Sequence, residues 1–346
     1  MGMKSFSGVM SRMGIDLGSS QIRIYAGNKV VLSENSVAVI SQADDSVAGF
    51  GVNALVRYHQ EPERYKLEWP VKHGVIDDYY LTKDMLQYFM EKAMHRSVSR
   101  PSVMISIPSG TSSVVRHALT DAALHAGAQH VFLIQAAAAA VLGARLSLSL
   151  PEVQLSLVIG RDVSDCGLFS CGGIVADGAI PFGGRNIDEG IRMYLLERFH
   201  VMIGSDEAEE IKREMATMAA PIDEHVINVR GRRDEDGVEV VLTLTARELA
   251  PVLQSLMLPV IRLLKRVIRS AQPEMADDLL RNGMVLSGGS ALLSGASDWM
   301  AGEIGIPVFV PDNPENVVAA GCFYALNEYR KLPGIVESGE MYYRGE

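Results

Sequence analysis

Three glycine-bearing turns are the parts of this sequence that could do chemistry. They lie at residues 18–20, 160–162 and 288–290, and each follows a short apolar strand. Turns of this kind expose backbone N–H groups that can hold phosphate oxygens. A single turn is weak support, because glycine also serves ordinary hairpins. Three such turns in one chain predict a site for a phosphate-bearing ligand.

The elements around the first two turns repeat one plan. Residues 14–32 alternate apolar and polar positions around a Gly-Ser-Ser turn, which predicts a β-meander. Residues 157–175 run through the same features, with Gly160 at the position of Gly18. A duplicated domain explains this repeat.

Apolar periodicity predicts the elements that position the turns. Helices are expected at about 81–94, 112–126 and 187–199, and strands at 103–108, 131–134 and 305–311. A long core helix should follow the capping box from Thr245 to Glu248. The alternation of strands and helices indicates a mixed α/β layer domain.

Composition excludes several classes of protein. The chain has 346 residues, is 48% hydrophobic and has a net charge of -10, so it can form a large core in two or more domains and is a poor match for nucleic acid. No apolar run is long enough to span a bilayer. The cysteines, Cys166, Cys171 and Cys322, have no CxxC spacing, and we expect them to be buried small hydrophobes in a reducing cytoplasm.

The first thirteen residues have two interpretations. Apolar residues from Met3 to Met13 recur at spacings of three and four, with Lys4 and Arg12 between them. This spacing fits a short basic amphipathic helix that lies on a membrane. A frayed start of the chain fits equally well, because so few residues form a marginal helix in water.

Several segments together resemble one family. In chain order they are GIDLGSS (14–20), VKHGVIDDYYLTKDMLQYF (71–89), ISIPSGTSSVVRHALTDAALHAGA (105–128), FGGRNIDEGI (182–191) and NGMVLSGGSALLSG (282–295). These segments resemble the bacterial actins of the MreB and MreB-like (Mbl) family, in the actin-like ATPase superfamily, over residues 14–328. The resemblance implies an α/β, actin-like (ribonuclease H-like) duplicated fold, with two lobes and four subdomains around a nucleotide cleft.

The resemblance also implies domain boundaries. Lobe I is expected to comprise residues 14–146 and 317–346, with a small subdomain inserted at about 33–66. Lobe II is expected at 147–316, with its small subdomain at about 186–246. Residues 1–13 form the N-terminal tail.

The same resemblance assigns site residues for ATP and Mg²⁺. Asp16 matches the acid that orients the water shell of the metal in relatives. The residues that match nucleotide-binding positions are Gly18, Ser19 and Ser20 for the outer phosphates, Gly160 for the second phosphate turn, Gly288, Gly289 and Ser290 for the adenosine side, and Glu210 and Lys212 for the base and ribose. For Glu210 and Lys212, a solvated helix face is the alternative interpretation.

Two motifs depart from the family pattern. Gln135 and Ala136 stand where relatives have an acidic pair, and a glutamine can still orient a water molecule. Val158 replaces the acid of the second phosphate motif, and loss of a general base commonly costs about 10²- to 10⁴-fold in rate.

Arg161 and Asp162 replace glycines of the same motif. Their side chains should obstruct the approach of a phosphate, and Asp162 would repel it by up to about 4 kcal/mol at about 4 Å. We therefore expect weak or absent ATPase activity and weakened nucleotide binding. Arg161 could instead supply the charge of the metal ion by reaching Asp16 or a phosphate. The interpretation we favour is a surface arginine that pairs with Asp162 or Asp165.

The resemblance implies a cell shape-determining cytoskeletal protein that forms actin-like filaments at the inner face of the cell membrane and organises cell-wall synthesis. Expected partners are further copies of itself, MreB paralogues, membrane-bound cell-wall elongation proteins and, peripherally, the membrane, but not nucleic acid. A non-polymerising regulatory or scaffold protein of the same fold is the main alternative. An active ATPase is the third interpretation.

Overall fold

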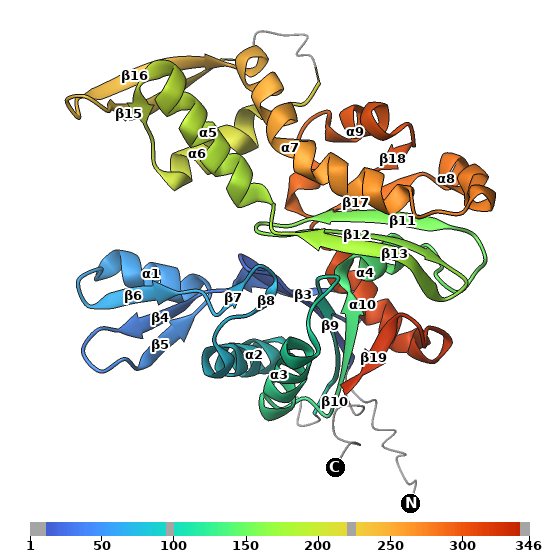
Figure 1. Cartoon of the computed structure of the whole chain (residues 1–346). Coiled ribbons are helices and arrows are strands. Elements are labelled where there is room, and N and C mark those ends of the chain that lie inside the picture. Colours follow the sequence, from blue (N-terminus) through green and yellow to red (C-terminus); the bar gives the residue numbers. More distant parts are fainter. Residues whose placement is uncertain (1–11, 95–99, 220–225, 340–346) are drawn as a thin grey trace, which may run out of the picture. The chain divides into compact units, whose positions relative to one another are not determined.

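The computed structural model describes residues 12–94, 100–219 and 226–339. It divides into two compact units (Figure 1). Unit 1 comprises Met1–Arg145 and Val318–Glu346, and unit 2 comprises Leu146–Val317. The amphipathic helix predicted at the N-terminus lies outside the described residues, apart from Arg12 and Met13. For these two the prediction is wrong, because they begin a strand of the unit 1 sheet and Met13 is buried in its core.

Unit 1 is built on a six-stranded sheet in the order β19-β10-β9-β1-β2-β3. Its strands are β1 (Arg12–Leu17), β2 (Gln21–Ala26), β3 (Lys29–Asn35), β9 (Ser102–Ile107), β10 (His130–Gln135) and β19 (Val336–Ser338). Strands β1 to β3 form the predicted antiparallel meander, and β1, β9 and β10 are parallel. The carboxyl ends of the three parallel strands therefore meet at one edge of the sheet.

Both faces of this sheet are covered by helices. Helices α2 (Tyr79–Met94) and α3 (Ser113–His125) pack on the face that carries Met13 and Ile15. Helix α10 (Val317–Glu328) lies on the other face, where a Cβ atom added to Gly14 would be 2.3 Å from the Ala319 carbonyl oxygen. The alternation along β1 follows from the two-residue period of a strand that is buried on both sides.

Small residues bring α10 close to α4 (Ala136–Gly143). A Cβ atom on Gly321 would lie 1.7 Å from the carbonyl oxygen of Ala139. The alanines from 137 to 140 are all fully buried. The alanine-rich sequence thus serves helix-to-helix packing within unit 1.

A small sheet extends unit 1. Its order is β5-β4-β6, formed by β4 (Ala38–Ser41), β5 (Val47–Phe50) and β6 (Tyr65–Glu68), and α1 (Val52–Gln60) packs against it. A two-stranded ribbon, β7 (Val71–Lys72) and β8 (Val75–Ile76), precedes α2.

Unit 2 repeats the strand order of unit 1. Its five-stranded sheet runs β13-β12-β11-β17-β18, which matches β3-β2-β1-β9-β10 strand for strand. The strands are β11 (Gln154–Ile159), β12 (Ser164–Ser170), β13 (Gly173–Ile180), β17 (Met284–Ser287) and β18 (Val308–Phe309). The last strand is shorter than the one expected at 305–311.

Helices and a second small sheet complete unit 2. The helices are α5 (Gly184–Phe199), α6 (Ser205–Met215), α7 (Ala246–Ile268), α8 (Ala276–Asn282) and α9 (Ala296–Ile304), and the small sheet contains β14 (Val201–Met202), β15 (Val226–Arg233) and β16 (Glu239–Thr245). Helix α7 begins at the predicted capping box, in which Thr245 Oγ1 accepts a hydrogen bond from the Glu248 amide. Ten of its side chains are buried, as expected of a core helix.

The cysteine prediction is wrong for one of the three residues. Cys166 and Cys322 are fully buried, and burial raises the pKa of both thiols. Cys171 is exposed. It lies in the turn between β12 and β13 with a φ of 52°, where the chain reverses direction and leaves the core.

Candidate functional site

The first glycine turn joins β1 to β2. The Gly18 amide donates a 3.1 Å hydrogen bond to the Gln21 carbonyl, and a Cβ atom on Gly18 would lie 2.7 Å from that oxygen. The turn is therefore tight enough to require glycine. In the part of the chain that the structure describes, no group accepts a hydrogen bond from the amides of Ser19 and Ser20. These two N–H groups are available to an anion.

Polar groups lie at the same edge of the unit 1 sheet. Asp16 Oδ1 accepts a 2.9 Å hydrogen bond from Ser106 Oγ, where β1 and β9 both end. Gln135 ends the next parallel strand, β10, and is buried. Burial raises the pKa of Asp16, although Arg23 and the Ser106 hydrogen bond act in the opposite direction. Sequence reasoning found Asp16 and Gln135 but missed Ser106, whose signal is a polar residue at the end of a buried strand.

The second turn, between β11 and β12, has the hydrogen bond of the first. The Gly160 amide donates to the Val163 carbonyl at 2.9 Å, as the Gly18 amide does to Gln21. Among the described residues, none accepts a hydrogen bond from the amides of residues 161–163. The carbonyls of Gly160 and Arg161 point the other way and accept from the amides of Gly184 and Arg185 at the start of α5. The turn therefore keeps its available N–H groups, even though Arg161 and Asp162 stand where the family has glycines.

Ion pairs hold the two side chains that replace those glycines. Arg185 Nε lies 2.9 Å from Asp162 Oδ1, and the Asp162 side chain is only 4% exposed. Arg161 Nη1 lies 3.5 Å from Glu209 Oε2 on α6. The sequence interpretation paired Arg161 with Asp162 or Asp165. The structure pairs it with Glu209 instead, because α6 brings this carboxylate, distant in sequence, to the turn.

Glu209 has a closer partner than Arg161. Arg213 Nη2 lies 2.6 Å from Glu209 Oε1, one helical turn away on α6. Partial burial alone would raise the pKa of Glu209, but Arg213, Lys212 and Arg161 together lower it. Glu209 is therefore a carboxylate, and its contact with Arg161 is the looser of its two ion pairs.

The third turn meets the second at the start of α5. Gly288 has a φ of 87°, and a Cβ atom on it would lie 2.3 Å from the Ile159 carbonyl oxygen, so glycine is required there. The Cβ position of Gly184 lies 3.3 Å from Lys212 Nζ, 3.6 Å from Ser290 Oγ and 3.8 Å from the Gly160 carbonyl oxygen. Unit 2 thus brings together three residues that the sequence predicted from separate motifs: Gly160, Lys212 and Ser290.

Lys212 lies in this group through a buried ion pair. Its Nζ is 2.6 Å from Asp188 Oδ1 and donates a 3.2 Å hydrogen bond to the Gly184 carbonyl. Burial raises the pKa of Asp188, and Lys212 counteracts part of this effect. Glu210, in contrast, is exposed on α6, whereas Glu209 faces the second turn.

Val158 has a hydroxyl and a carboxyl group beside it on the unit 2 sheet. It is the ladder partner of Asp165 on β12 and of Ser287 on β17, so the three side chains share one face. Asp165 is 2% exposed and Ser287 is fully buried. The described residues contain no group of three or more His, Cys, Asp or Glu side chains arranged to hold a metal ion.

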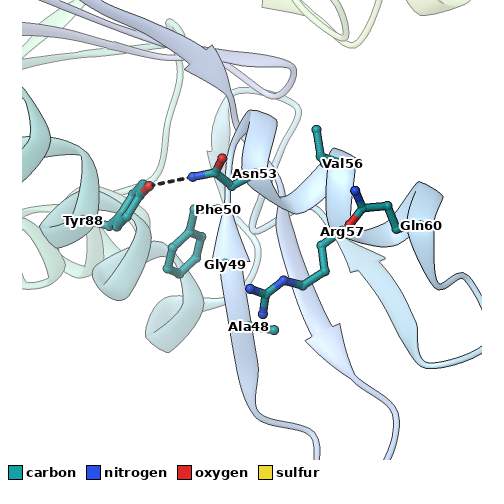
Figure 2. A pocket seen from close by; sticks show the side chains of 8 residues that line it. All are labelled: Ala48, Gly49, Phe50, Asn53, Val56, Arg57, Gln60 and Tyr88. Carbon is teal, nitrogen blue, oxygen red and sulfur yellow. Dashed lines mark hydrogen bonds between the residues drawn. The ribbon is translucent and has the colours of Figure 1, made fainter.

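A pocket of about 370 Å³ lies elsewhere in unit 1, between α1, β5 and Tyr88 of α2 (Figure 2). The Asn53 amide nitrogen donates a 3.4 Å hydrogen bond to the Tyr88 hydroxyl across it. Phe50, Val56 and Arg57 also line this pocket. None of the site residues predicted from the sequence does.

Known proteins that resemble this chain identify its family. A model of the MreB/Mbl protein family matches residues 10–333. The chain belongs to the MreB/Mbl family. The cell shape-determining protein MreB of Escherichia coli is 35% identical over 328 residues, which cover 92% of this chain and 94% of the relative. The resemblance stated from the sequence is thereby confirmed.

Solved structures of MreB-like proteins confirm the actin-like fold. MreB5 of Spiroplasma citri bound to ADP has a TM-score of 0.86 at 25% identity, covering 93% of this chain and 98% of that one. The MamK double helical filament has a TM-score of 0.77 at 16% identity, covering 92% and 99%, and shows the fold alone. As for the membrane, no described helix of this MreB/Mbl chain combines the length and apolarity needed to cross one.

Proposed function

We propose that this chain is a cell shape-determining cytoskeletal protein that assembles head to tail into filaments on the cytoplasmic face of the cell membrane and organises cell-wall synthesis. Family membership over residues 10–333 and the similarity to the cell shape-determining protein of Escherichia coli support the cell-shape role. Head-to-tail contacts form an open filament when their rotation does not close a ring. The partners are further copies, MreB paralogues, membrane-bound elongation proteins and the membrane surface.

The proposal includes a bound adenine nucleotide. The observation that carries it is that each unit has a matched turn, Gly18 to Gln21 and Gly160 to Val163, with backbone amides that find no acceptor within the described part of the chain. These amides suit phosphate oxygens. Lys212, Ser290 and Gly184 form the neighbouring polar group within unit 2, for the ribose and base. The relative from Spiroplasma citri was solved with ADP, in agreement with this assignment.

Magnesium fits less well than the nucleotide. When bound, the ion would neutralise phosphate charge, and Asp16 is the residue we assign to its water shell. Asp16 accepts a hydrogen bond from Ser106, and burial raises its pKa. Ionising this acid to serve a metal ion therefore costs free energy. Val158 offers no oxygen from the second unit.

Hydrolysis is the impaired step in this proposal. Val158 can neither accept a proton nor orient a water molecule, and Gln135 can act only by hydrogen bonding. Asp162 contributes less repulsion than its sequence position implies, because its carboxylate is paired with Arg185. Nucleotide binding should therefore survive better than turnover.

Sedimentation and phosphate release test the proposal together. The full chain should pellet as filaments, visible by electron microscopy, while it releases phosphate far more slowly than the triple variant Val158→Asp, Arg161→Gly, Asp162→Gly. In the fraction of that variant that melts as folded protein, at saturating ATP and magnesium, we expect turnover to rise by about 10²-fold or more. If the chain stays in the supernatant both with and without nucleotide, the result would favour the interpretation as a non-polymerising scaffold. Rapid phosphate release by the unmodified chain would favour the active ATPase.

Vesicle flotation tests the membrane part. The full chain should float with vesicles that contain anionic lipids, and a chain that begins at residue 12 should not, because it lacks the proposed amphipathic segment but keeps strand β1 (Arg12–Leu17) whole. Equal flotation of both would place the contact elsewhere.

A further inference from the structure

We propose that Arg161 is a built-in cation that binds the phosphates of the nucleotide, so that binding at the second turn does not depend on a divalent metal ion. This inference rests on the nucleotide binding proposed above. It concerns a residue that replaces a glycine of the family motif, and its function therefore belongs to this chain.

The first support is the position of Arg161. It is the residue after Gly160, in the turn whose amides at 161–163 have no acceptor among the described residues. Once released from Glu209, the Arg161 guanidinium would add donors to the N–H groups of its own turn, and arginine binds phosphate oxygens through two parallel hydrogen bonds. The turn is thus suited to an anion without any bridging cation.

The second support is the charge balance of the turn. Its one carboxylate, Asp162, is buried against Arg185 and is therefore neutralised. With Asp162 paired, the turn carries the positive charge of Arg161 and offers no oxygen ligand to a metal ion. A metal ion placed at this turn would meet the Arg161 guanidinium, and the neighbouring carboxylate, Glu209 on α6, is already paired with Arg213.

The third support is the way in which Arg161 is held. Its side chain is 33% exposed, and its guanidinium is 3.5 Å from Glu209, outside the range of a strong charged hydrogen bond. Glu209 is already paired with Arg213 at 2.6 Å. Arg161 can leave Glu209 for a phosphate while Glu209 keeps a partner. The contact with Glu209 therefore keeps Arg161 near the turn without fixing it there.

The experiment measures affinity with and without magnesium. Calorimetry would use the full chain with ATP, and with inorganic triphosphate as a probe without base or ribose, in EDTA and in magnesium. We expect the wild-type affinity for ATP to differ by less than about tenfold between the two conditions. Arg161→Ala should weaken binding in EDTA by about 10- to 100-fold for both probes.

Two further variants separate this role from a structural one. Arg213→Ala removes the other arginine that contacts Glu209 and should change the affinity in EDTA by less than about threefold. Glu209→Gln releases Arg161 and should strengthen binding in EDTA by about two- to fivefold. Thermal melting of each variant without ligand identifies any loss of folding, and Arg161→Lys should recover part of the affinity because it keeps the charge.

The outcomes distinguish the two proposals. Strict magnesium dependence in the wild type, with no effect of Arg161→Ala in EDTA, would overturn the role of Arg161 and leave nucleotide binding standing. Absence of binding in both conditions would overturn both nucleotide proposals, whereas the sedimentation assay would still decide filament formation separately.

Discussion

Ser106 donates a 2.9 Å hydrogen bond to the carboxylate of Asp16 at the edge where two parallel strands of unit 1 end. This single bond does not offset burial, which raises the pKa of Asp16. The folded protein without ligand therefore holds an acid that resists ionisation. Burial of this acid therefore lowers the stability of the empty protein at any pH at which Asp16 ionises.

Asp16→Asn should stabilise the protein without ligand. Because the folded-state pKa of Asp16 lies above its unfolded value, the stability contributed by this group is present below the unfolded pKa and is lost as the pH rises through the folded pKa. We expect the variant to gain about 1 kcal/mol at neutral pH. The gain should shrink toward acidic pH, where wild-type Asp16 is protonated. Urea unfolding of both proteins across this range measures it, and a variant less stable at neutral pH would contradict the prediction.

Val158→Asp on its own should destabilise unit 2. The new carboxylate would lie opposite Asp165 on the same face of the sheet, and Asp165 is only 2% exposed. A buried charge without a partner costs about 3 kcal/mol. Val158→Asn, which has the same size and no charge, should cost less. Equal losses for the two variants in urea unfolding would show that charge is not the cause.

Lys212→Met should lower the free energy of unfolding by about 3 kcal/mol, because it leaves Asp188 buried without its cation. The double variant Lys212→Met, Asp188→Leu should recover most of this loss, since it removes both charges. A double-mutant cycle by urea unfolding measures the coupling. Additive effects of the single variants would mean that the two side chains do not form a pair in solution.

Gly321→Ala should destabilise unit 1 by about 1–3 kcal/mol or more, because the added methyl group meets the Ala139 carbonyl oxygen at 1.7 Å. Gly302 is the matched control, since it lies in α9 and its Cβ position has no atom within 4 Å. Gly302→Ala should raise stability by about 0.5–1 kcal/mol through helix propensity. Thermal melting would separate the two, and the same sign for both would contradict the packing argument.

Local signals predicted the fold well. The helix expected at 112–126 is α3, with Ser112 accepting from the Val115 amide at its start and Gly127 at a φ of 105° after its end. The capping box of α7 is present as well. These signals are reliable because the caps satisfy helix-end groups within a few residues of the chain.

Contacts between distant residues were less predictable. Glu209 reaches Arg161 only because α6 packs beside α5, and no local pattern in the sequence encodes this pairing. The turn after Gly288 begins with a short 3-10 helix at Gly289–Leu292, and α9 starts only at Ala296. Tertiary packing decides such details, and periodicity within a segment does not contain them.

The exposure of Cys171 also has a practical consequence. It is the accessible thiol among the three cysteines of the chain, and the other two are enclosed in the two cores with raised pKa values. A maleimide fluorophore should therefore attach to the β12–β13 turn of the unaltered protein, at the end of β12 opposite the second glycine turn. Fluorescence from that label could follow the joining of subunits in real time without any engineered cysteine.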